Sequence, residues 1–421
     1  MQRLTSAIMT STGKRVPIPR RGVDYRGKMV LAPMVRSGEL PSRLLALYYG
    51  ADLVWGPETV DRSMIGTTRK VNEALGTIDY TRFPSHGAQN KDHSQKESLI
   101  YRLHPEREGS RLIFQVGTSD PERAVQAARV VAADVAGIDV NAGCPKPFST
   151  HGGMGAALLQ TPDKLCAILE ALVDEIVPEF EIGISVKIRL LETPERTEHL
   201  VRKLCATGIT GLTIHCRTTP MRPRERAIRE QLKMIADICR ESGVACLMNG
   251  DVANRAQAED LVKEFGVDGA MIATAAETNS SCFRAEANGG LASWEEVVGE
   301  YLKMCIEMEN RWGNTKYLLN HLIPGKSPKY KEVTVSKSYS QTCKVLGLEH
   351  LEVPAKEADD HIGITAEAEH QGRKAMKNKN KNQSAMAAGG KQNRNKQGKK
   401  RLSQRGASQQ EPSQPAVALN V

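Results

Sequence analysis

Aromatic residues make up only 4% of the 421 residues, and no uninterrupted apolar run approaches the length of a membrane helix. Because a spanning helix needs about 20 mostly apolar residues, we do not expect an integral membrane protein. The nine cysteines include no CxxC pair. Structural zinc and iron–sulfur sites use closely spaced ligand pairs, so we expect reduced thiols and no metal site.

Excess positive charge is confined to one segment. Twelve of the 58 Lys and Arg lie between Arg373 and Arg405, where there is no acidic residue. The whole chain has a formal net charge of +9. Outside this segment, 46 basic residues stand against 49 acidic ones, so the rest of the chain is nearly neutral. A composition dominated by Asn, Gln, Lys, Ser and Gly buries too little apolar surface to fold. We predict a disordered basic tail over residues 353–421 and a disordered basic arm over residues 1–26.

Two short features bear on the location of the protein in the cell. The N-terminal arm has no acidic residue before Asp24, and acid-poor segments of this kind are also typical of mitochondrial transit peptides. The cluster Lys399-Lys400-Arg401 resembles part of a nuclear signal, although such clusters are frequent in disordered tails. We expect a cytoplasmic protein, with the nucleus as a further site and mitochondria less favoured.

From Lys28 onward the chain alternates short β-branched runs with helical patterns. The runs are apolar on both sides, which is typical of parallel strands covered by helices. The expected strands are Met29–Met34, Ala51–Trp55, Leu112–Val116, Ala136–Val140, Gly183–Ile188, Gly211–Ile214, Ala245–Met248 and Gly269–Ile272. Eight repeats over about 250 residues predict a (β/α)8 barrel. A doubly wound open sheet is the alternative, but the GxGxxG motif typical of its first turn is missing.

We expect the barrel to occupy residues 27–290. The interval Thr59–Gly109 is too long for one helix, so an insertion is expected at about 77–109, with an inserted loop over the polar stretch Phe83–His104. The helices expected between the strands are Leu40–Tyr49, Pro121–Ala133, Asp163–Glu175, Thr197–Ala206, Ile228–Glu241 and Ala256–Phe265. Helical spacing continues over Trp294–Trp312, Tyr317–Leu322 and Ser338–Leu346, so residues 291–352 are predicted to form a small helical domain.

Polar side chains follow most of the expected strands. Functional groups of such barrels lie at the C-terminal ends of the strands. These ends carry Glu58, Gln115, Asn141, Cys144, Lys187, Arg189, His215, Asn249 and Asp251. A purely structural barrel end is often apolar, so this convergence predicts an active site.

Lys187 continues an alternating strand into the barrel or its mouth. A buried lysine must meet an anion or lose its charge. A reduced flavin, whose N1–C2=O edge is negative, is one such anion, and a barrel carboxylate such as Asp139 is the alternative partner. The segment Asn249-Gly250-Asp251 follows the seventh strand, where such barrels hold phosphate groups, although Asn-Gly is also a common turn.

Cys144 and the loop after the sixth strand are two further candidates. A thiol is mostly protonated at neutral pH, so Cys144 suits a general acid or a nucleophile, and an inert buried cysteine is the alternative. The loop contains Arg217, Arg222 and Arg224. A charge run is usually only solvated, but beside an active site it attracts the phosphates of a nucleotide, NADPH or RNA.

Taken in order, these motifs resemble those of the tRNA-dihydrouridine synthases, and most closely the eukaryotic class that modifies position 20 in the D-loop of cytosolic tRNA. The resemblance runs from about Lys28 to Leu348. It depends on the segments Val30–Arg36, Ala51–Trp55, Phe114–Ser119, Gly137–Lys146, Gly152–Leu159, Val186–Arg189 and Gly313–Tyr317.

The resemblance implies bound FMN, NADPH as the reductant, and hydride transfer to C6 of a uracil ring while Cys144 protonates C5. The flavin contacts that it implies or that we expect are Pro33, Met34, Gln115, Lys187, His215, Asn249, Gly250, Asp251, Ala273 and Thr274. The expected contacts to the substrate are Asn141, Arg189, Arg217, Arg222, Arg224 and Lys316. We expect a monomer that binds tRNA.

The chain departs from the family pattern in two places. Where the family often has Gly-Arg after the eighth strand, this chain has Ala273-Thr274, so the arginine that clamps the flavin phosphate is missing. The polar tail is not the double-stranded-RNA-binding domain of some animal members, so tRNA contacts are expected from the sixth loop, Lys316 and Arg311, with salt-dependent attraction from the tail. A flavin barrel acting on a free pyrimidine and a non-catalytic RNA-binding factor remain as alternatives.

Overall fold

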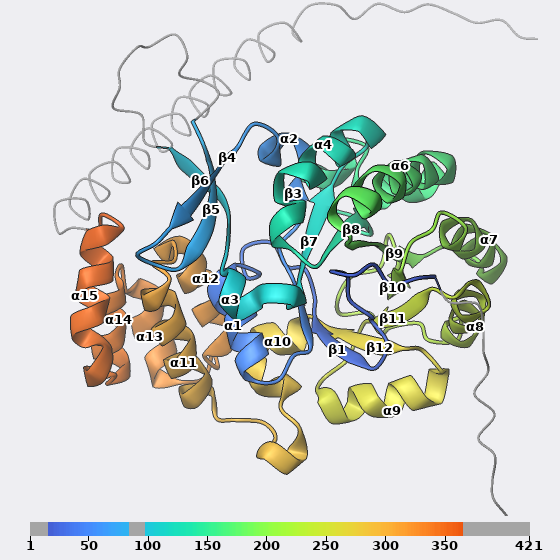
Figure 1. Ribbon diagram of the computed structural model, residues 1–421. Coiled ribbons are helices and arrows are strands. Elements are labelled where there is room, and N and C mark those ends of the chain that lie inside the picture. The colour runs from blue at the N-terminus through green and yellow to red at the C-terminus, as the bar shows by residue number, and fades with distance from the viewer. Residues whose placement is uncertain (1–15, 84–96, 365–421) are drawn as a thin grey trace, which may run out of the picture. The chain divides into compact units, whose positions relative to one another are not determined.

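Eight parallel strands close into a barrel in the computed structural model, which describes residues 16–83 and 97–364 (Figure 1). The strands are β1 (Lys28–Leu31), β2 (Leu53–Trp55), β7 (Leu112–Gly117), β8 (Gly137–Ala142), β9 (Gly183–Leu190), β10 (Gly211–Thr218), β11 (Ala245–Asn249) and β12 (Gly269–Ile272). Pairing of β1 with β12 and of β2 with β7 completes the ring. The predicted (β/α)8 barrel is confirmed, and each strand overlaps the run that predicted it.

Helices cover the outside of the barrel (Figure 1). They are α1 (Leu40–Tyr48), α4 (Pro121–Val131), α6 (Pro162–Phe180), α7 (Pro194–Cys205), α8 (Leu232–Ser242) and α9 (Arg255–Phe265). Their starts follow ordinary capping chemistry: at α4, the Asp120 side chain accepts a hydrogen bond from the Arg123 N–H and Pro121 is the first helical residue, which satisfies a donor that the helix leaves unpaired.

The interior of the barrel is apolar toward the N-terminal ends of the strands. Alternate strand residues point inward, and the inward cluster comprises Tyr25, Val30, Ala32, Leu53, Trp55, Ile113, Ala136, Ala245, Leu247 and Met271. A second and larger cluster lies between the strands and the helices. Continuing the same alternation toward the C-terminal ends brings polar side chains inward, so the sequence of each strand positions the site above its own core.

Residues 16–26 pack against the barrel, so the prediction of a disordered arm is wrong for this stretch. Tyr25 is fully buried at the N-terminal end of the barrel. Its ring fits because Gly137 and Gly211 begin their strands there, and a Cβ on Gly211 would lie 2.5 Å from the Tyr25 ring. Arg21 donates to the carbonyls of Phe180 and Ala133. The remaining arm, residues 1–15, lies outside the described residues.

The interval predicted as an insertion contains a small antiparallel sheet, so the prediction of a loop is wrong for the described part of Phe83–His104. The insertion begins with β3 (Thr59–Val60) and α2 (Asp61–Met64) and contains β4 (Thr68–Asn72), β5 (Thr77–Arg82), β6 (Ser98–Leu103) and α3 (Pro105–Glu108). Polar composition hid the strands because Asp79 and Arg102 form an ion pair across them, while alternate side chains such as Tyr80 and Tyr101 are buried.

A group of helices follows the barrel. They are α10 (Thr274–Thr278), α11 (Trp294–Glu307), α12 (Trp312–Leu322), α13 (Pro328–Val335), α14 (Tyr339–Leu346) and α15 (Glu352–His361). The single helix expected over Trp294–Trp312 is wrong, because the chain breaks at residues 308–311, where the buried Tyr339 hydroxyl donates to the Asn310 carbonyl. α11 packs against α1, and α12 against α10, so helical region and barrel belong to one unit that extends to Ala358.

The predicted start of the disordered tail at residue 353 is also wrong, because α15 continues to His361. The basic segment between Arg373 and Arg405 lies outside the described residues. Within the part of the chain that is described, no helix is long and apolar enough to cross a membrane.

Candidate active site

The inward side chains at the C-terminal ends of the strands form a polar layer above the apolar barrel core. It comprises Gln115 from β7, Asp139 and Asn141 from β8, Lys187 from β9, His215 from β10 and Asn249 from β11. All of them except Asp139, which was considered only as a partner for Lys187, were predicted to converge, and strand alternation explains why they do. Pro33 and Met34, which follow β1, are half-buried.

Lys187 is the central cation of this layer. Its expected alternative partner, Asp139, instead accepts hydrogen bonds from Gln115 (2.8 Å) and Ser185 (2.7 Å), and burial raises the pKa of Asp139 to about 6. Among the residues that the structure describes, none forms a hydrogen bond or ion pair with the Lys187 ammonium. Burial and the neighbouring Arg189 lower the pKa of Lys187 to about 8. An unpaired cation in this position is suited to a bound anion.

His215 is a neutral hydrogen-bonding group next to Lys187. Burial, with the charges of Lys187, Arg189 and Arg217, lowers the pKa of His215 to about 2. The Arg217 Nη1 lies 3.2 Å from the His215 Nε2. Since a guanidinium can only donate, Nε2 is the acceptor and Nδ1 carries the proton. His215 therefore provides one N–H donor to the mouth of the barrel.

A hollow lies beside His215, between the ends of β11 and β12. Its walls include Arg189, His215, Arg217, Pro223, Asn249, Gly250, Asp251, Met271, Ala273, Thr274 and Ala275. At Gly250 the backbone has φ +122°, and a Cβ would lie 3.3 Å from Ala227 and 3.4 Å from His215. Any larger residue would be strained there and would narrow the hollow. Asn249 faces the same hollow and donates to the Met271 carbonyl at 2.9 Å.

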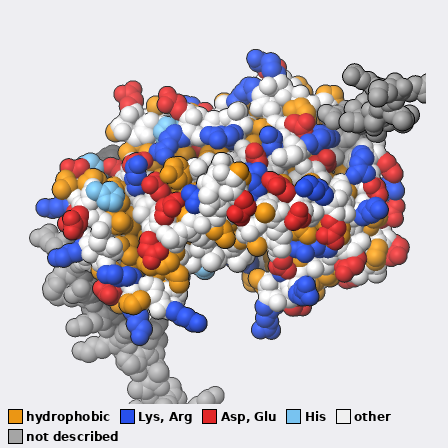
Figure 2. Space-filling view, turned by 90° about the horizontal axis from the view of Figure 1, so that it is seen from below, with side chains coloured by type: hydrophobic (Ala, Val, Ile, Leu, Met, Phe, Trp, Pro, Cys, Tyr) orange, Lys and Arg blue, Asp and Glu red, His pale blue; other side chains and the backbone are white. Residues whose placement is uncertain are grey.

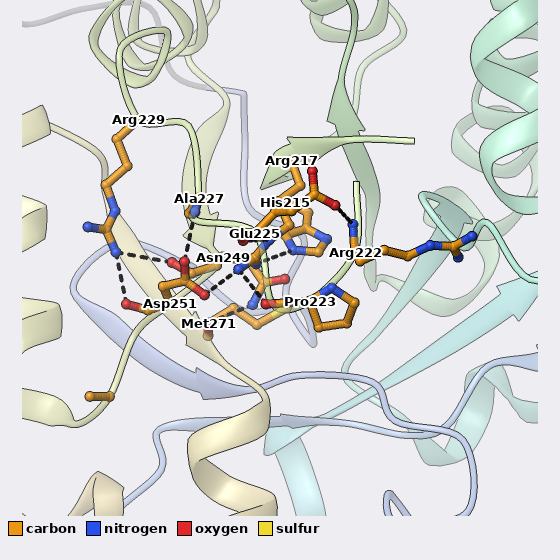
Figure 3. Close-up of polar contacts among 12 residues, drawn as sticks. His215, Arg217, Arg222, Pro223, Glu225, Ala227, Arg229, Asn249, Asp251 and Met271 are labelled. Carbon is orange, nitrogen blue, oxygen red and sulfur yellow. Dashed lines mark hydrogen bonds and ion pairs between the residues drawn. The ribbon is translucent and has the colours of Figure 1, made fainter. Parts of the chain in front are cut away.

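Arg217 holds the loop after β10 against the end of β11 (Figure 3). Its guanidinium is buried and donates to Asp251 (2.5 Å), to the Pro223 carbonyl (3.0 Å) and to the Glu225 carbonyl (2.7 Å). Asp251 also accepts from the Ala227 N–H at 2.7 Å. Arg217 was predicted as a contact to the substrate; the structure buries its side chain, which lines and shapes the hollow.

The other predicted substrate cations lie in different surroundings. Arg222 and Arg224 are exposed, and Figure 3 shows the Arg222 side chain extending away from the Arg217 cluster. Arg189 is buried and donates to the carbonyls of Gly143 (2.7 Å) and Thr218 (2.9 Å). Lys316, on α12, is half-buried and donates to the Ser336 carbonyl at 2.8 Å. Only the first two are fully available to a large ligand.

Cys144 lies on the loop after β8 and is held there by its backbone. The Asn141 side-chain oxygen accepts from the N–H groups of Gly143 (2.9 Å) and Cys144 (3.1 Å), and the Cys144 carbonyl accepts from Ala156 (2.9 Å). All nine cysteines are within the described residues, and Cys144 is the one that is not buried. Partial burial, with the negative charge of Glu58, raises the pKa of the Cys144 thiol above its ordinary value, which keeps it protonated.

Glu58 is the site residue to which sequence reasoning gave no role. It was noted only as a polar residue at a strand end, whereas the structure places its carboxyl group against the Cys144 loop, where it accepts a hydrogen bond from the Ser149 hydroxyl at 3.1 Å. The contact joins residues 91 positions apart in sequence, and no local pattern signals it.

The family of the protein follows from comparison with known sequences. Residues 30–341 match the model of the dihydrouridine synthase (Dus) family, so the chain belongs to that family, and the resemblance predicted from the motifs is confirmed. It is 49% identical over 333 residues to the tRNA-dihydrouridine(20) synthase (NAD(P)+) of Schizosaccharomyces pombe, covering 78% of this chain and 66% of that protein.

A second relative gives the same result. The chain is 45% identical over 329 residues to the protein of the same name from Saccharomyces cerevisiae, covering 77% of this chain and 84% of that protein. The tRNA-dihydrouridine(20a/20b) synthase of Saccharomyces cerevisiae is more distant, at 29% identity over 264 residues, with 63% of this chain and 64% of that protein covered. The present chain thus spans about two thirds of the length of the first relative and most of the second.

Proposed function

We propose that this protein reduces the C5=C6 bond of uridine at position 20 in the D-loop of tRNA, with FMN as cofactor and NADPH as reductant. The observation that carries the proposal is the 49% identity to a tRNA-dihydrouridine(20) synthase over 78% of this chain. The site supports it independently, because a reduction of this kind requires one hydride and one proton. The mouth of the barrel has an unpaired cation on one side and a protonated thiol on the other.

The residues present fit a flavin mononucleotide. Lys187 is free to meet the negative edge of the reduced ring, and the His215 N–H donor lies beside it. The hollow at Gly250 and Thr274 suits a phosphate. It lacks the arginine of many family members at position 274, but Arg217 lines the same hollow and supplies a positive charge there. When bound, the reduced flavin supplies the hydride for C6.

Cys144 supplies the proton for C5. Its thiol stays protonated at neutral pH because its pKa is raised, so it acts as a general acid rather than as a nucleophile. Asn141 and Arg189 hold the backbone of the loop that presents it. The buried layer around Lys187 excludes bulk water from the reacting face, which strengthens each of these electrostatic contacts.

The tRNA backbone is contacted by exposed cations around the mouth. Arg222 and Arg224 occupy the loop after β10, and Arg311 is exposed at the start of α12. Figure 2 shows a face of the molecule on which basic and acidic side chains are interspersed, so that face offers no continuous positive surface. The target base must turn out of the tRNA fold to reach the site.

The proposal is tested anaerobically with the full-length protein. We expect NADPH to reduce the bound flavin and unmodified tRNA to reoxidise it rapidly, while free uridine and orotate do not. Reoxidation by the free pyrimidines would instead assign the protein to small-molecule metabolism. A purified protein that does not bind FMN would overturn the flavin proposal and favour a non-catalytic RNA-binding factor.

A further inference from the structure

Glu58 lies between β2 and β3 and directs its carboxyl group toward the loop that carries Cys144. It fits there because Gly117, at the end of β7, has no side chain: a Cβ on that residue would lie 2.5 Å from the Glu58 Oε1. The Ser149 hydroxyl donates to the same oxygen at 3.1 Å. Gly155 has a similar effect on the other side, since a Cβ there would collide with Ser149 and with the Cys144 backbone.

The second carboxyl oxygen of Glu58 is left without a partner. Oε2 is buried, and among the residues that the structure describes none forms a hydrogen bond with it. Glu58 also forms no ion pair with a basic residue in that part of the chain. A buried carboxylate with an unsatisfied oxygen is unfavourable, whereas a protonated carboxyl group carries no net charge. The geometry therefore favours the protonated form.

The groups that face Glu58 are few. They are the Ser149 hydroxyl, which hydrogen-bonds to it, the nearby polar side chains of Asn141 and Cys144, and the exposed Lys146. All four favour the carboxylate, but burial outweighs them and raises the pKa of Glu58 above its ordinary value. The ionisations of Glu58 and Cys144 are therefore coupled. Because two negative charges so close together repel, ionisation of either group raises the pKa of the other and keeps it protonated.

We propose that Glu58 is the group that reprotonates Cys144 after each reduction of uridine, an inference that rests on the proposed function. The Sγ–H bond breaks as the C5–H bond forms, which leaves a thiolate. The O–H bond of Glu58 then breaks and the Sγ–H bond is restored, which leaves a carboxylate. Glu58 finally takes one proton from solvent, so one proton enters from water for each uridine reduced.

The direction of this transfer follows from acidity. A carboxyl group is ordinarily a far stronger acid than a thiol, and partial burial raises the pKa of Cys144 as well as that of Glu58. The thiolate formed in the reaction is therefore a sufficient base to take the proton from Glu58. The same neighbour then opposes a second ionisation, which holds Cys144 ready for the next substrate.

The first test measures the thiol in the resting protein and needs neither tRNA nor turnover. Iodoacetamide alkylation of Cys144 is followed across pH by mass spectrometry of its peptide, which is selective because the other eight cysteines are buried. The variant Glu58→Gln keeps the shape of the side chain but cannot ionise. In the unmodified protein the alkylation profile should change slope at the pH where Glu58 loses its proton, because the charge that Glu58 then carries opposes ionisation of the thiol. The variant should lack this change of slope and should react about fivefold to tenfold faster above that pH. An unchanged pH profile would overturn the proposal.

The second test separates proton return from structural damage. In Glu58→Gln the thiol is already protonated, so we expect the first dihydrouridine per enzyme to form at nearly the normal rate and later ones about tenfold more slowly. Glu58→Asp should recover part of the loss, and Ser149→Ala, which removes only the hydroxyl donor, should slow later turnovers less. Equal slowing of first and later turnovers would overturn the proposal.

These outcomes are distinguishable from failure of the proposed function. If the unmodified protein forms no dihydrouridine in any tRNA, the function is wrong, but the alkylation profiles still report whether Glu58 controls the Cys144 proton. If the function holds and the profiles coincide, only the role of Glu58 is wrong.

Discussion

The two sides of the barrel mouth respond in opposite ways to the same burial. On the side of β9 and β10, burial removes protons from bases: the pKa of Lys187 falls to about 8 and that of His215 to about 2. On the side of β2 and β8, burial keeps protons on acids, because the pKa values of Glu58 and Cys144 are raised. A low dielectric favours the neutral form of either kind of group.

The difference shows how one cavity can support both a hydride transfer and a proton transfer. With His215 neutral and Asp139 already held by hydrogen bonds from Gln115 and Ser185, Lys187 is a mostly protonated group at neutral pH that no described residue pairs with. It is therefore the position at which a bound anion gains most, while the thiol side remains free of net charge. Substitutions at Lys187 should therefore leave the reactivity of the Cys144 thiol unchanged, and substitutions at Cys144 should leave flavin binding unchanged.

Cys144→Ala should have the largest effect on activity. Removing the general acid is expected to slow dihydrouridine formation by about 10² to 10⁴-fold, because no other exposed thiol replaces it. Flavin binding and reduction by NADPH should persist, since they depend on the opposite side of the mouth. Dihydrouridine in tRNA is measured by mass spectrometry and flavin reduction by absorbance; undiminished product would remove Cys144 from the mechanism.

Lys187→Met should weaken flavin binding by about 10-fold to 100-fold, the usual value of a charge-assisted contact of 1.5 to 3 kcal/mol. Titration of the apoprotein with FMN, followed by fluorescence, measures it. Lys187→Arg, which keeps the charge, is the matched control and should lose less. Cys144 alkylation should be nearly the same in all three proteins, and a large change in the Met variant would contradict independence of the two sides.

The same lysine predicts a pH dependence of flavin affinity. The folded apoprotein holds Lys187 protonated below a pKa of about 8 and neutral above it, whereas the unfolded chain keeps the proton up to about pH 10.4. Affinity for an anionic ligand should therefore decrease as pH rises through 8, and the stability of the apoprotein should increase between pH 8 and 10. Lys187→Met should show neither change, and a flat affinity profile in the unmodified protein would refute the assignment.

Asp251→Asn should have a smaller effect, confined to the basic side. It replaces the ionic partner of the buried Arg217 by a neutral one, and we expect a loss of about 1 to 2 kcal/mol, limited because Asp251 is half-exposed. Urea denaturation measures this loss. The hollow should also bind flavin more weakly, with Asp251→Glu as the control that keeps the charge. Equal stability and equal flavin affinity would mean that the loop does not depend on this pair.

The double variant Arg222→Ala and Arg224→Ala should give the smallest effect. Both side chains are exposed, so stability should not change, whereas the logarithm of tRNA affinity should depend less steeply on the logarithm of salt concentration, by a slope of about 1 to 2. Filter binding across salt concentrations measures it.

Deleting residues 371–421 should weaken tRNA binding at low salt without changing the modified position, and a changed position would contradict this role of the tail.

The sequence predicted those site residues whose position depends only on the alternation of inward and outward side chains along a strand. Lys187, His215 and Asn249 could be assigned because inward and outward positions alternate and strand ends are visible as apolar runs. The burial of Arg217 could not be predicted, because its partner Asp251 is 34 residues away and an isolated charge run gives no sign of burial. Likewise, Glu58 gains its role only through Cys144 and Ser149 on another loop.

The strands of the insertion and the packing of residues 16–26 could not be predicted for a related reason. Tyr80 and Tyr101 lie in a polar stretch whose charges pair with one another, so composition indicated a loop. Tyr25 packs into a space created by glycines more than 100 residues later. Such contacts are tertiary and leave no local periodicity.

Tyr25 also has a kinetic consequence. By filling the N-terminal end of the barrel it leaves the C-terminal mouth as the entrance to Lys187 and Cys144. Under the proposed function, NADPH and the tRNA substrate would share that entrance, and we expect them to bind one after the other. Initial rates measured at several fixed concentrations of NADPH should give parallel lines in double-reciprocal plots, the behaviour of an enzyme that exchanges its two substrates one after the other.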